Sequence, residues 1–149
     1  MKVIFLDIDG VIATDDGKTD FDRLQSSAIR KLNRLIDDTH AQIVISSTWR
    51  KYYSLLQLIK MLRLKGFNHS RNIIGSTPVL KGFNNGTYIE RGEEIAKWLE
   101  LTPVEQYVIL DDDIVLNHDD HFVQVIDGWK TGIQDEHIET AKKILGVRQ

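Results

Sequence analysis

Residues 3–11 read VIFLDIDGV, and the rest of the chain is best understood from this stretch outward. Its first four residues are apolar without interruption, which is typical of a strand buried on both faces of a parallel sheet. Two acids follow, Asp7 and Asp9, separated by one residue. The pattern predicts a buried strand whose carboxyl end carries two carboxylates.

The rest of the chain alternates between strand and helix. Apolar runs of strand length are followed by amphipathic runs of helix length, as in βα units around a mainly parallel sheet. Further strands are predicted at 42–45, 107–110 and 122–125, with a short extended piece plus a hairpin or loop within 68–90. Helices are predicted at about 22–36, 52–64, 91–101 and 135–145. We therefore expect a three-layer α/β/α, Rossmann-like fold in a single domain spanning residues 1–149.

The composition excludes several classes of protein. The chain has 149 residues, 42% of them hydrophobic, so it can form a core of its own. It contains no Cys, which excludes a disulfide framework, a thiolate zinc site and a cysteine nucleophile. No run of about 18 apolar residues and no signal sequence is recognisable, so we expect a cytoplasmic protein without a membrane span. With 19 Lys and Arg against 22 Asp and Glu, the net charge of −3 does not favour a broad nucleic-acid surface.

Polar side chains follow three of the predicted strands at their carboxyl ends. They are Asp7 and Asp9 after the first strand, Ser46 and Ser47 after the second, and Asp111 and Asp112 after the third. In an open parallel sheet, ligands bind at this edge. If the three strands are neighbours, up to four carboxylates converge, and two charges about 4 Å apart repel by about 4 kcal/mol near a protein surface. Such a cluster needs a cation, and an all-oxygen site favours Mg²⁺ before Ca²⁺ or Mn²⁺.

These residues resemble the motifs of the haloacid dehalogenase (HAD) superfamily of phosphohydrolases. FLDIDGV at 5–11 resembles the first motif, an apolar strand followed by D-x-D-G-[VT]. The serines of VISSTWR at 44–50 resemble the second motif, and VILDDD at 108–113 resembles the fourth. The third motif is a Lys or Arg near the start of the helix before the last of these strands. Arg91 matches it best, and Lys81 in the preceding loop is the second candidate.

The layout resembles the capless branch of the superfamily. No long insertion follows the first motif, and only about a loop of irregular chain precedes Arg91. Within that branch, SSTWR at 46–50 and RGEEIAKWL at 91–99 are similar to the phosphatase-like HAD domain of Swiss army knife RNA repair proteins. The resemblance implies a HAD-like fold with little or no cap, and a site open to large substrates.

The resemblance also implies an activity, that of a Mg²⁺-dependent phosphomonoester hydrolase acting through an aspartyl-phosphate. Asp7 would be the nucleophile, and Asp9 would protonate the leaving oxygen and later activate the attacking water. Ser46 or Ser47 would bind a phosphoryl oxygen. Arg91 would neutralise the same oxygens and hold the nucleophilic aspartate. The implied Mg²⁺ ligands are Asp7, Asp111, Asp112 and the backbone carbonyl of Asp9.

The implied partner is a phosphorylated substrate, with a nucleic-acid 3′-phosphate end or a nucleotide as the candidates. Two alternatives stay open at the level of sequence. A non-catalytic or regulatory module would keep the fold and bind phosphate-bearing ligands without turnover, but the intact Asp7 and Asp9 count against it. A phosphotransferase or phosphonate-type enzyme of the same superfamily is the other alternative, and the acid at Asp9 favours hydrolysis.

Three further features of the sequence lie near the motifs or contain residues that could bind a ligand. Arg50, just past the serines, is a candidate for an additional phosphate contact. Trp49 is expected to pack against the sheet rather than to stack on a base. His118 and His121 flank two acids, and we expect them to be solvated polar residues rather than a second metal site.

Overall fold

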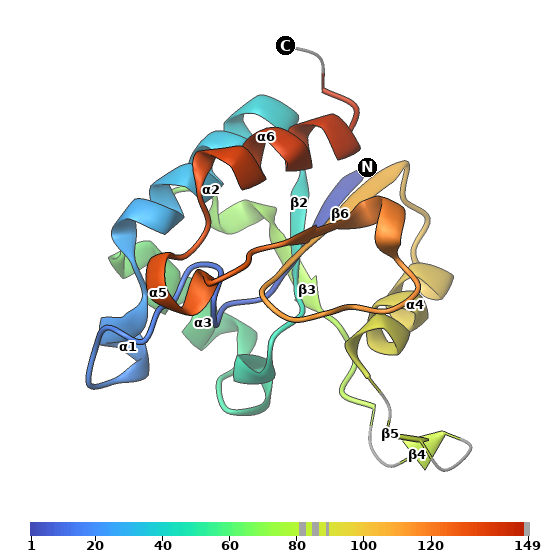
Figure 1. The fold of residues 1–149 in the computed structure, drawn as a ribbon, viewed down its shortest axis with the longest axis horizontal. Helices are drawn as coiled ribbons and strands as arrows, with labels where there is room; N and C mark the ends of the chain where they lie inside the picture. Colours follow the sequence, from blue (N-terminus) through green and yellow to red (C-terminus); the bar gives the residue numbers. More distant parts are fainter. Residues whose placement is uncertain (81–82, 85–86, 89, 148–149) are drawn as a thin grey trace.

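The computed structural model describes residues 1–80, 83–84, 87–88 and 90–147. Its centre is a five-stranded sheet in the order β3-β2-β1-β6-β7, in which every pair of neighbouring strands is parallel. The strands are β1 (Lys2–Leu6), β2 (Gln42–Ile45), β3 (Ile73–Ser76), β6 (Gln106–Asp111) and β7 (Phe122–Gln124). A short antiparallel pair, β4 (Phe83–Asn84) and β5 (Thr87–Tyr88), lies outside this sheet (Figure 1).

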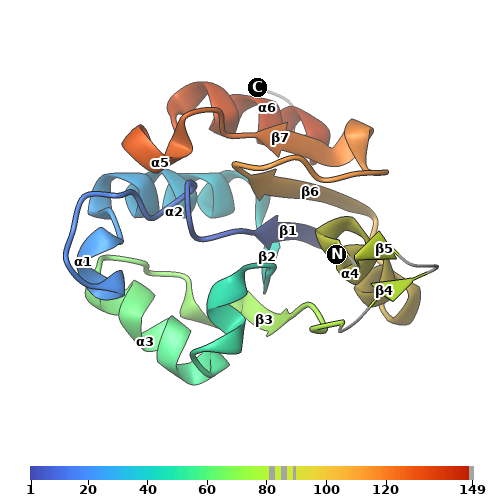
Figure 2. The same ribbon diagram turned by 60° about the horizontal axis from the view of Figure 1, so that its bottom comes forward.

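Helices cover both faces of the sheet. Those of the described residues are α1 (Asp20–Arg23), α2 (Ser26–Thr39), α3 (Leu55–Leu64), α4 (Arg91–Leu101), α5 (Gly128–Thr131) and α6 (Asp135–Ile144). Short 3₁₀ turns are η1 (Thr48–Lys51), η2 (Ser70–Asn72) and η3 (Asp119–His121). In Figure 1 the sheet runs between α4 on one side and α2 and α6 on the other, and Figure 2 gives a second view of these layers. The predicted three-layer α/β/α, Rossmann-like fold is confirmed.

Alternate side chains of the central strands supply two apolar cores. Ile4 and Leu6 of β1 pack into the core that α2, α3 and α6 complete. Val3 and Phe5 point to the other face, where they join Val44 of β2 and the apolar side of α4. Because successive residues of a strand face opposite sides, helices on both faces require the uninterrupted apolar run seen in the sequence.

The helix predicted at 22–36 is in fact two helices, α1 and α2, separated by an extended residue at Leu24. The break forms because the chain pairs here with the loop after β1: the N–H of Gln25 donates to the carbonyl of Ile12 (2.9 Å), and Leu24 forms a bridge with Ala13. Leu24 is also 2% exposed, so the break buries an apolar side chain. Tertiary hydrogen bonds here override the helical periodicity of the sequence.

Other boundaries differ for local reasons. The helix predicted at 52–64 begins only at Leu55, because Ser54 and Gln57 form a capping box. The extended piece predicted within 68–90 is β3, an edge strand of the main sheet, and the predicted hairpin is the β4–β5 pair. Residues 85–86 of its predicted turn lie outside the described residues. Helix α5 was not predicted, because four residues are too few to show a periodic pattern.

The edge at which the strands end is not covered by an additional domain. Residues 7–25, between β1 and α2, contain only α1, and the described part of 77–90, between β3 and α4, contains only the β4–β5 pair. The described residues of these two segments thus form little or no cap, as expected. In the described part of the chain, no helix is both long and apolar enough to cross a membrane.

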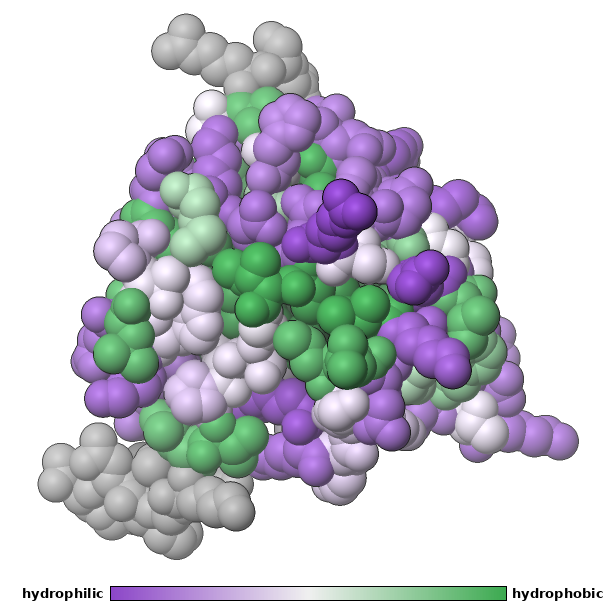
Figure 3. Space-filling model, turned by 180° about the vertical axis from the view of Figure 1, so that it is seen from behind, coloured by the Kyte–Doolittle hydropathy of each residue, from purple (hydrophilic) through white to green (hydrophobic). Residues whose placement is uncertain are grey.

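Several large apolar side chains of the described residues are exposed at the surface. Figure 3 shows the molecule from behind, with apolar side chains gathered at the centre of that face and hydrophilic ones around them. Folded proteins normally expose much apolar surface, so this face by itself identifies no site.

Candidate active site

Three neighbouring strands, β2, β1 and β6, bring their carboxyl ends to one edge of the sheet. The ladder continues one residue past β1 and β2: the N–H of Asp7 donates to the carbonyl of Leu110 (3.0 Å), and the N–H of Ser46 donates to the carbonyl of Leu6 (2.9 Å). Asp7, Ser46 and Asp111 are therefore fixed in register with one another. The sequence left open whether these strands were neighbours, and the structure shows that they are.

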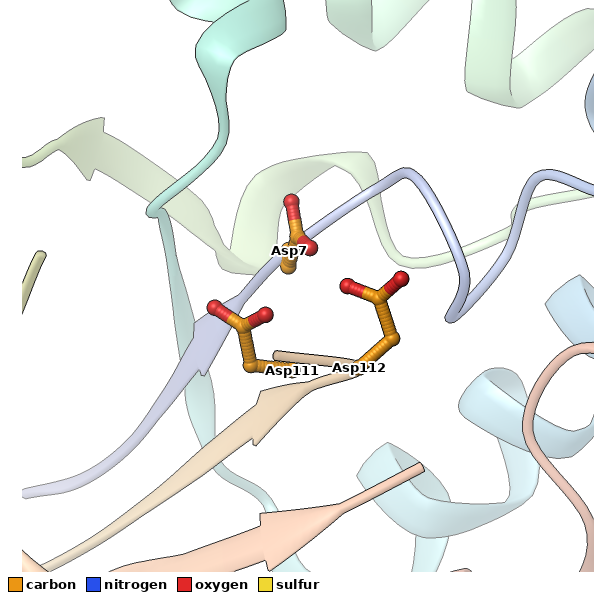
Figure 4. Close-up of side chains that lie close together, drawn as sticks. All are labelled: Asp7, Asp111 and Asp112. Carbon is orange, nitrogen blue, oxygen red and sulfur yellow. The ribbon is translucent and has the colours of Figure 1, made fainter. Parts of the chain in front are cut away.

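The side chains of Asp7, Asp111 and Asp112 form an acidic cluster at this edge, where their carboxylates face one another (Figure 4). One carboxylate oxygen from each lies within 4.8 Å of the others. Asp7 is only 4% exposed and Asp111 only 1%. The carboxylate of Asp9 is not part of the cluster, and the use of its backbone carbonyl as a metal ligand stays a prediction. Three carboxylate oxygens at this spacing can hold a hard divalent cation such as Mg²⁺.

The surroundings of the acidic cluster disfavour the ionised forms of its carboxyl groups. Burial raises the pKa of Asp7 well above its usual value, and the nearby Asp111 carboxylate raises it further, although Arg91 opposes the shift. Burial also raises the pKa of Asp112. Each shift means that the folded protein disfavours the ionised form of the carboxyl group. A bound cation would offset the free-energy cost of burying these charges and of their mutual repulsion.

Arg91 supplies the positive charge that contacts the acidic cluster. It is the first residue of α4, and its Nη1 lies 2.6 Å from Asp111 Oδ2 and 3.3 Å from Asp7 Oδ2. Burial alone would lower the pKa of the guanidinium, but Asp7 and Asp111 outweigh it and raise the pKa above its ordinary value. Arg91 thus occupies the place expected for the third motif. The second candidate, Lys81, lies outside the described residues.

The two serines after β2 differ in their hydrogen bonds. Ser47 Oγ accepts a hydrogen bond from the N–H of Trp49 (3.2 Å) and caps the turn η1. Ser46 is 1% exposed, and its Oγ is the one buried side-chain polar atom without a hydrogen-bond partner among the described residues. An unsatisfied buried hydroxyl costs about 1–3 kcal/mol. A ligand at this edge of the sheet would give Ser46 the partner that the protein does not.

Comparison with known families gives an independent result. Over residues 3–138 the sequence matches the family described as "HAD domain in Swiss Army Knife RNA repair proteins". The chain belongs to this family. Comparison with curated proteins and with solved structures gave no match. The resemblance read from the four motifs is confirmed, and the family places the chain among HAD-type hydrolases.

The glycine of the first motif fits the HAD domain for a steric reason. Gly10 has a φ of +76°, in the left-handed region that a residue with a side chain rarely adopts. A Cβ at Gly10 would overlap the Asp112 carboxylate, and a Cβ at Gly128 of α5 would overlap the backbone carbonyl of Gly10. The two glycines therefore let the first-motif turn lie directly against Asp112 and α5.

The residues after the serines have structural roles in this HAD domain. Arg50 lies at the hollow beside the acidic cluster, where its Nη2 lies 2.7 Å from Glu94 and its Nη1 donates to the carbonyl of Ser47 (2.7 Å). Its Nε donates to the carbonyl of Thr77 (3.1 Å). Its additional phosphate contact stays a prediction. Trp49 is 4% exposed and packs in the core, as expected.

Of the two histidines near η3, His118 is buried rather than solvated, so that expectation was wrong for His118, while His121 is half-buried. His118 is 8% exposed, its Nε2 donates to the carbonyl of Gly92 (2.9 Å), and its Nδ1 accepts from the hydroxyl of Tyr107 (2.9 Å). The ring of His121 stacks on Tyr107 with centroids 3.8 Å apart. Among the described residues, neither histidine belongs to a metal-binding group. His118 instead holds the first turn of α4, directly after Arg91.

Arg23 is the residue at the site that sequence reasoning missed. Its Nη2 lies 2.5 Å from Asp9 Oδ1. The two residues are 14 positions apart, and no periodic or motif signal links them. Their contact depends on the break between α1 and α2, which the sequence did not predict.

The surface hollows of the described residues include one beside the acidic cluster and a larger one elsewhere. One of about 270 Å³ adjoins the acidic cluster and is lined by Arg91, Asp111 and Lys51 among others. A larger one of about 770 Å³ is formed mainly by residues 67–72, which lead into the amino end of β3. That end of the sheet is opposite the acidic cluster, so the smaller hollow is the one that can accommodate a leaving group.

Proposed function

We propose that this HAD domain is a Mg²⁺-dependent phosphomonoester hydrolase that acts through an aspartyl-phosphate on Asp7. The observation that carries the proposal is the acidic cluster itself, in which the Asp7 carboxylate lies beside Asp111, Asp112 and the guanidinium of Arg91. Carboxylates gathered in this way bind a divalent cation, and a cation beside a nucleophilic carboxylate allows a phosphate dianion to approach.

In the first step, a carboxylate oxygen of Asp7 attacks the phosphorus atom and the bond from phosphorus to the leaving oxygen breaks. The carboxyl group of Asp9 gives its proton to that oxygen, so the product leaves as an alcohol. Arg91 and the unpartnered hydroxyl of Ser46 donate hydrogen bonds to the phosphoryl oxygens, where negative charge is concentrated.

In the second step, the Asp9 carboxylate removes a proton from water. The water oxygen attacks phosphorus, and the bond between phosphorus and Asp7 breaks. Inorganic phosphate is released, and both carboxyl groups return to their starting forms. The same side chain acts first as acid and then as base, and because the Asp9 side chain is 41% exposed, both the leaving group and water can reach it.

Asp7, Asp111, Asp112 and the Asp9 carbonyl are the groups that would hold Mg²⁺. The ion would supply positive charge against the carboxylates and the phosphoryl group. The residues present fit this ion, since three carboxylate oxygens converge within 4.8 Å and the chain has no cysteine to offer a thiolate.

For the substrate, we propose a phosphorylated nucleic-acid 3′ end or a nucleotide. The support is the family, whose description names RNA repair proteins, and the absence of a cap over the described site. A net charge of −3 counts against a broad nucleic-acid surface, so recognition would be confined to the phosphorylated end.

The activity is tested with 4-nitrophenyl phosphate. We expect turnover that depends on Mg²⁺, disappears with EDTA and returns when Mg²⁺ is restored. Asp7→Asn should reduce turnover to background, because asparagine is not a nucleophile here. Acid-quenched wild-type protein should carry a phosphoryl group on the peptide that contains Asp7. Asp113→Asn, which removes an exposed carboxylate outside the acidic cluster, is the matched control and should retain activity.

Two results would contradict the proposal. Wild-type protein that binds phosphate and Mg²⁺ without turnover would be the non-catalytic module instead. Turnover that survives both EDTA and Asp7→Asn would place the chemistry elsewhere. For the substrate, 3′-phosphorylated oligonucleotides, mononucleotides and sugar phosphates are compared by kcat/KM, and a strong preference for sugar phosphates would contradict a nucleic-acid end.

A further inference from the structure

Asp9 differs from the other carboxylates of the site in the exposure of its side chain and in its hydrogen-bond partner. Its backbone is fixed by a tight turn, in which the N–H of Gly10 donates to the carbonyl of Ala13 (2.8 Å) and the N–H of Ile12 donates to the carbonyl of Ile8 (3.0 Å). Its side chain is 41% exposed. Packing alone therefore does not fix the direction of this carboxylate, which leaves its polar contacts to set it.

Arg23 makes that contact. Its Nη2 donates to Asp9 Oδ1, and no hydrogen bond from any described residue reaches Asp9 Oδ2. One carboxylate oxygen is thus held, while the other accepts no hydrogen bond from the described residues, on a side chain that is 41% exposed. This is the arrangement that a group needs if it must exchange a proton with a leaving oxygen and then with water.

Arg23 is itself fixed by the rest of its guanidinium group. Its Nε donates to the carbonyl of Thr14 (2.9 Å), and its Nη1 lies 3.4 Å from Asp20 Oδ1. Asp20 accepts in turn a hydrogen bond from the hydroxyl of Tyr53 (2.6 Å). The planar guanidinium group therefore has a separate partner for each of its three nitrogens, which sets its orientation as well as its charge.

We infer that Arg23 is a positioning residue that directs the free oxygen of Asp9 toward the leaving group. The inference rests on the proposed function, because it assigns Arg23 a part in the proton transfer proposed for Asp9. Arg23 touches neither the acidic cluster nor Arg91 in the described contacts. It acts through Asp9 and not on the phosphoryl group.

The test compares two aryl esters that differ only in one nitro group, 4-nitrophenyl phosphate and phenyl phosphate. Nitrophenolate leaves readily without a proton, whereas phenolate is a poor leaving group. Loss of proton transfer therefore lowers kcat/KM more for phenyl phosphate. Loss of phosphate binding, or a general loss of folded protein, lowers kcat/KM equally for both esters. The kcat/KM for 4-nitrophenyl phosphate divided by the kcat/KM for phenyl phosphate therefore reports on the proton transfer alone.

We expect Arg23→Gln to raise this ratio by about tenfold, part of the roughly 10²- to 10⁴-fold that a positioned acid contributes. Arg23→Lys keeps the positive charge but loses the planar guanidinium with its three separately bonded nitrogens, so it should give an intermediate ratio. The double variant Arg23→Gln/Asp9→Asn should be no slower than Asp9→Asn alone. Arg34→Gln is the matched control, because it removes an arginine ion pair with Asp135 that joins α2 and α6.

The outcomes separate the inference from the proposed function. If wild-type protein hydrolyses neither ester, the proposed function fails and takes the inference with it. If wild-type protein hydrolyses both and the ratio is unchanged in Arg23→Gln and Arg23→Lys, only the inference fails. An equal rise of KM for both esters, or a further loss in the double variant, would assign Arg23 to phosphate binding and would also overturn it.

Discussion

At the scale of single residues, the acidic cluster shows a conflict between stability and chemistry. Burial and the Asp111 carboxylate both raise the pKa of Asp7, so the folded protein binds protons that the unfolded chain would release. A nucleophile must nevertheless be ionised. A bound cation would offset this charge, so a residue suited to catalysis lowers the stability of the metal-free fold.

Asp7→Asn should therefore stabilise the metal-free protein at neutral pH, by on the order of 1 kcal/mol. The folded pKa of Asp7 lies above the ordinary value of 3.8, so its contribution to stability is present at acid pH and is lost as the pH rises through the folded pKa. Asparagine does not titrate. The advantage of the variant should thus be absent in acid and grow as the pH rises. Urea unfolding in EDTA across this pH range measures it, and an equal gain in Asp113→Asn would show a general charge effect instead.

The two serines give a second prediction. Ser46→Ala should lower kcat/KM by about 10- to 100-fold, because a hydrogen bond to a charged group contributes about 1.5–3 kcal/mol. It should leave the free energy of unfolding unchanged or slightly higher, since the hydroxyl has no partner in the protein. Ser47→Ala should instead lower the free energy of unfolding by about 1 kcal/mol, through loss of the η1 cap. The reverse pattern in kinetics and unfolding would assign phosphate binding to Ser47.

At the scale of elements, the sequence predicted the helices and strands that have a local periodic pattern. It missed the features that depend on contacts between distant parts of the chain. Strand β2 and helix α4 have the predicted bounds, because an apolar run and a helical pattern with a following Thr102-Pro103 are local signals. The break at Leu24 is not local, since it arises from pairing with the loop after β1. The Arg23–Asp9 contact depends on that break, and it was missed for the same reason.

The amino end of α6 has a pH-sensitive cap. The N–H of Gln134 donates to Nδ1 of His137 (2.9 Å), which requires that nitrogen to be unprotonated. Burial lowers the pKa of His137 below its ordinary value of 6.5, although Glu136 opposes the shift. The folded state thus binds fewer protons than the unfolded chain. The stability contributed by this cap is present above about pH 6.5 and is lost as the pH falls through the folded pKa.

His137→Gln should remove this pH dependence, because glutamine at the third helical position can accept the same hydrogen bond without titrating. Relative to the variant, wild-type protein should lose unfolding free energy between about pH 7 and pH 5. The other histidines are common to both proteins and cancel in the difference. Urea unfolding of both proteins over this range measures the effect, and parallel pH profiles would contradict the assigned role of His137.

At the scale of the whole molecule, a net charge of −3 conceals how the acids are distributed. Three of the 22 acids form the acidic cluster at one edge of the sheet, contacted by the single cation Arg91 in the described contacts. The sequence could place these acids at strand ends, but it could not order the strands. The order β2-β1-β6 is what turns three separate strand ends into one site.

Mg²⁺ should therefore stabilise the whole fold and not only the site. At a concentration 100 times its Kd, a ligand that binds only the folded state adds about 2.7 kcal/mol. For a chain of this length, that corresponds to a rise in Tm of roughly 5–10 °C. Protons compete with the metal, because burial raises the pKa of both Asp7 and Asp112, so the rise in Tm should increase with pH.

Thermal unfolding with and without Mg²⁺, at constant ionic strength, measures this coupling. Asp112→Asn should lose most of the rise in Tm, because it removes one of the three converging carboxylates. Asp113→Asn, one residue further along the same loop, should keep it. An equal rise with Na⁺ would show that salt screening alone stabilises the fold. A rise that survives Asp112→Asn but is lost in Asp113→Asn would place the cation outside the acidic cluster, and the proposed role of Asp7 as a metal-assisted nucleophile would fail with it.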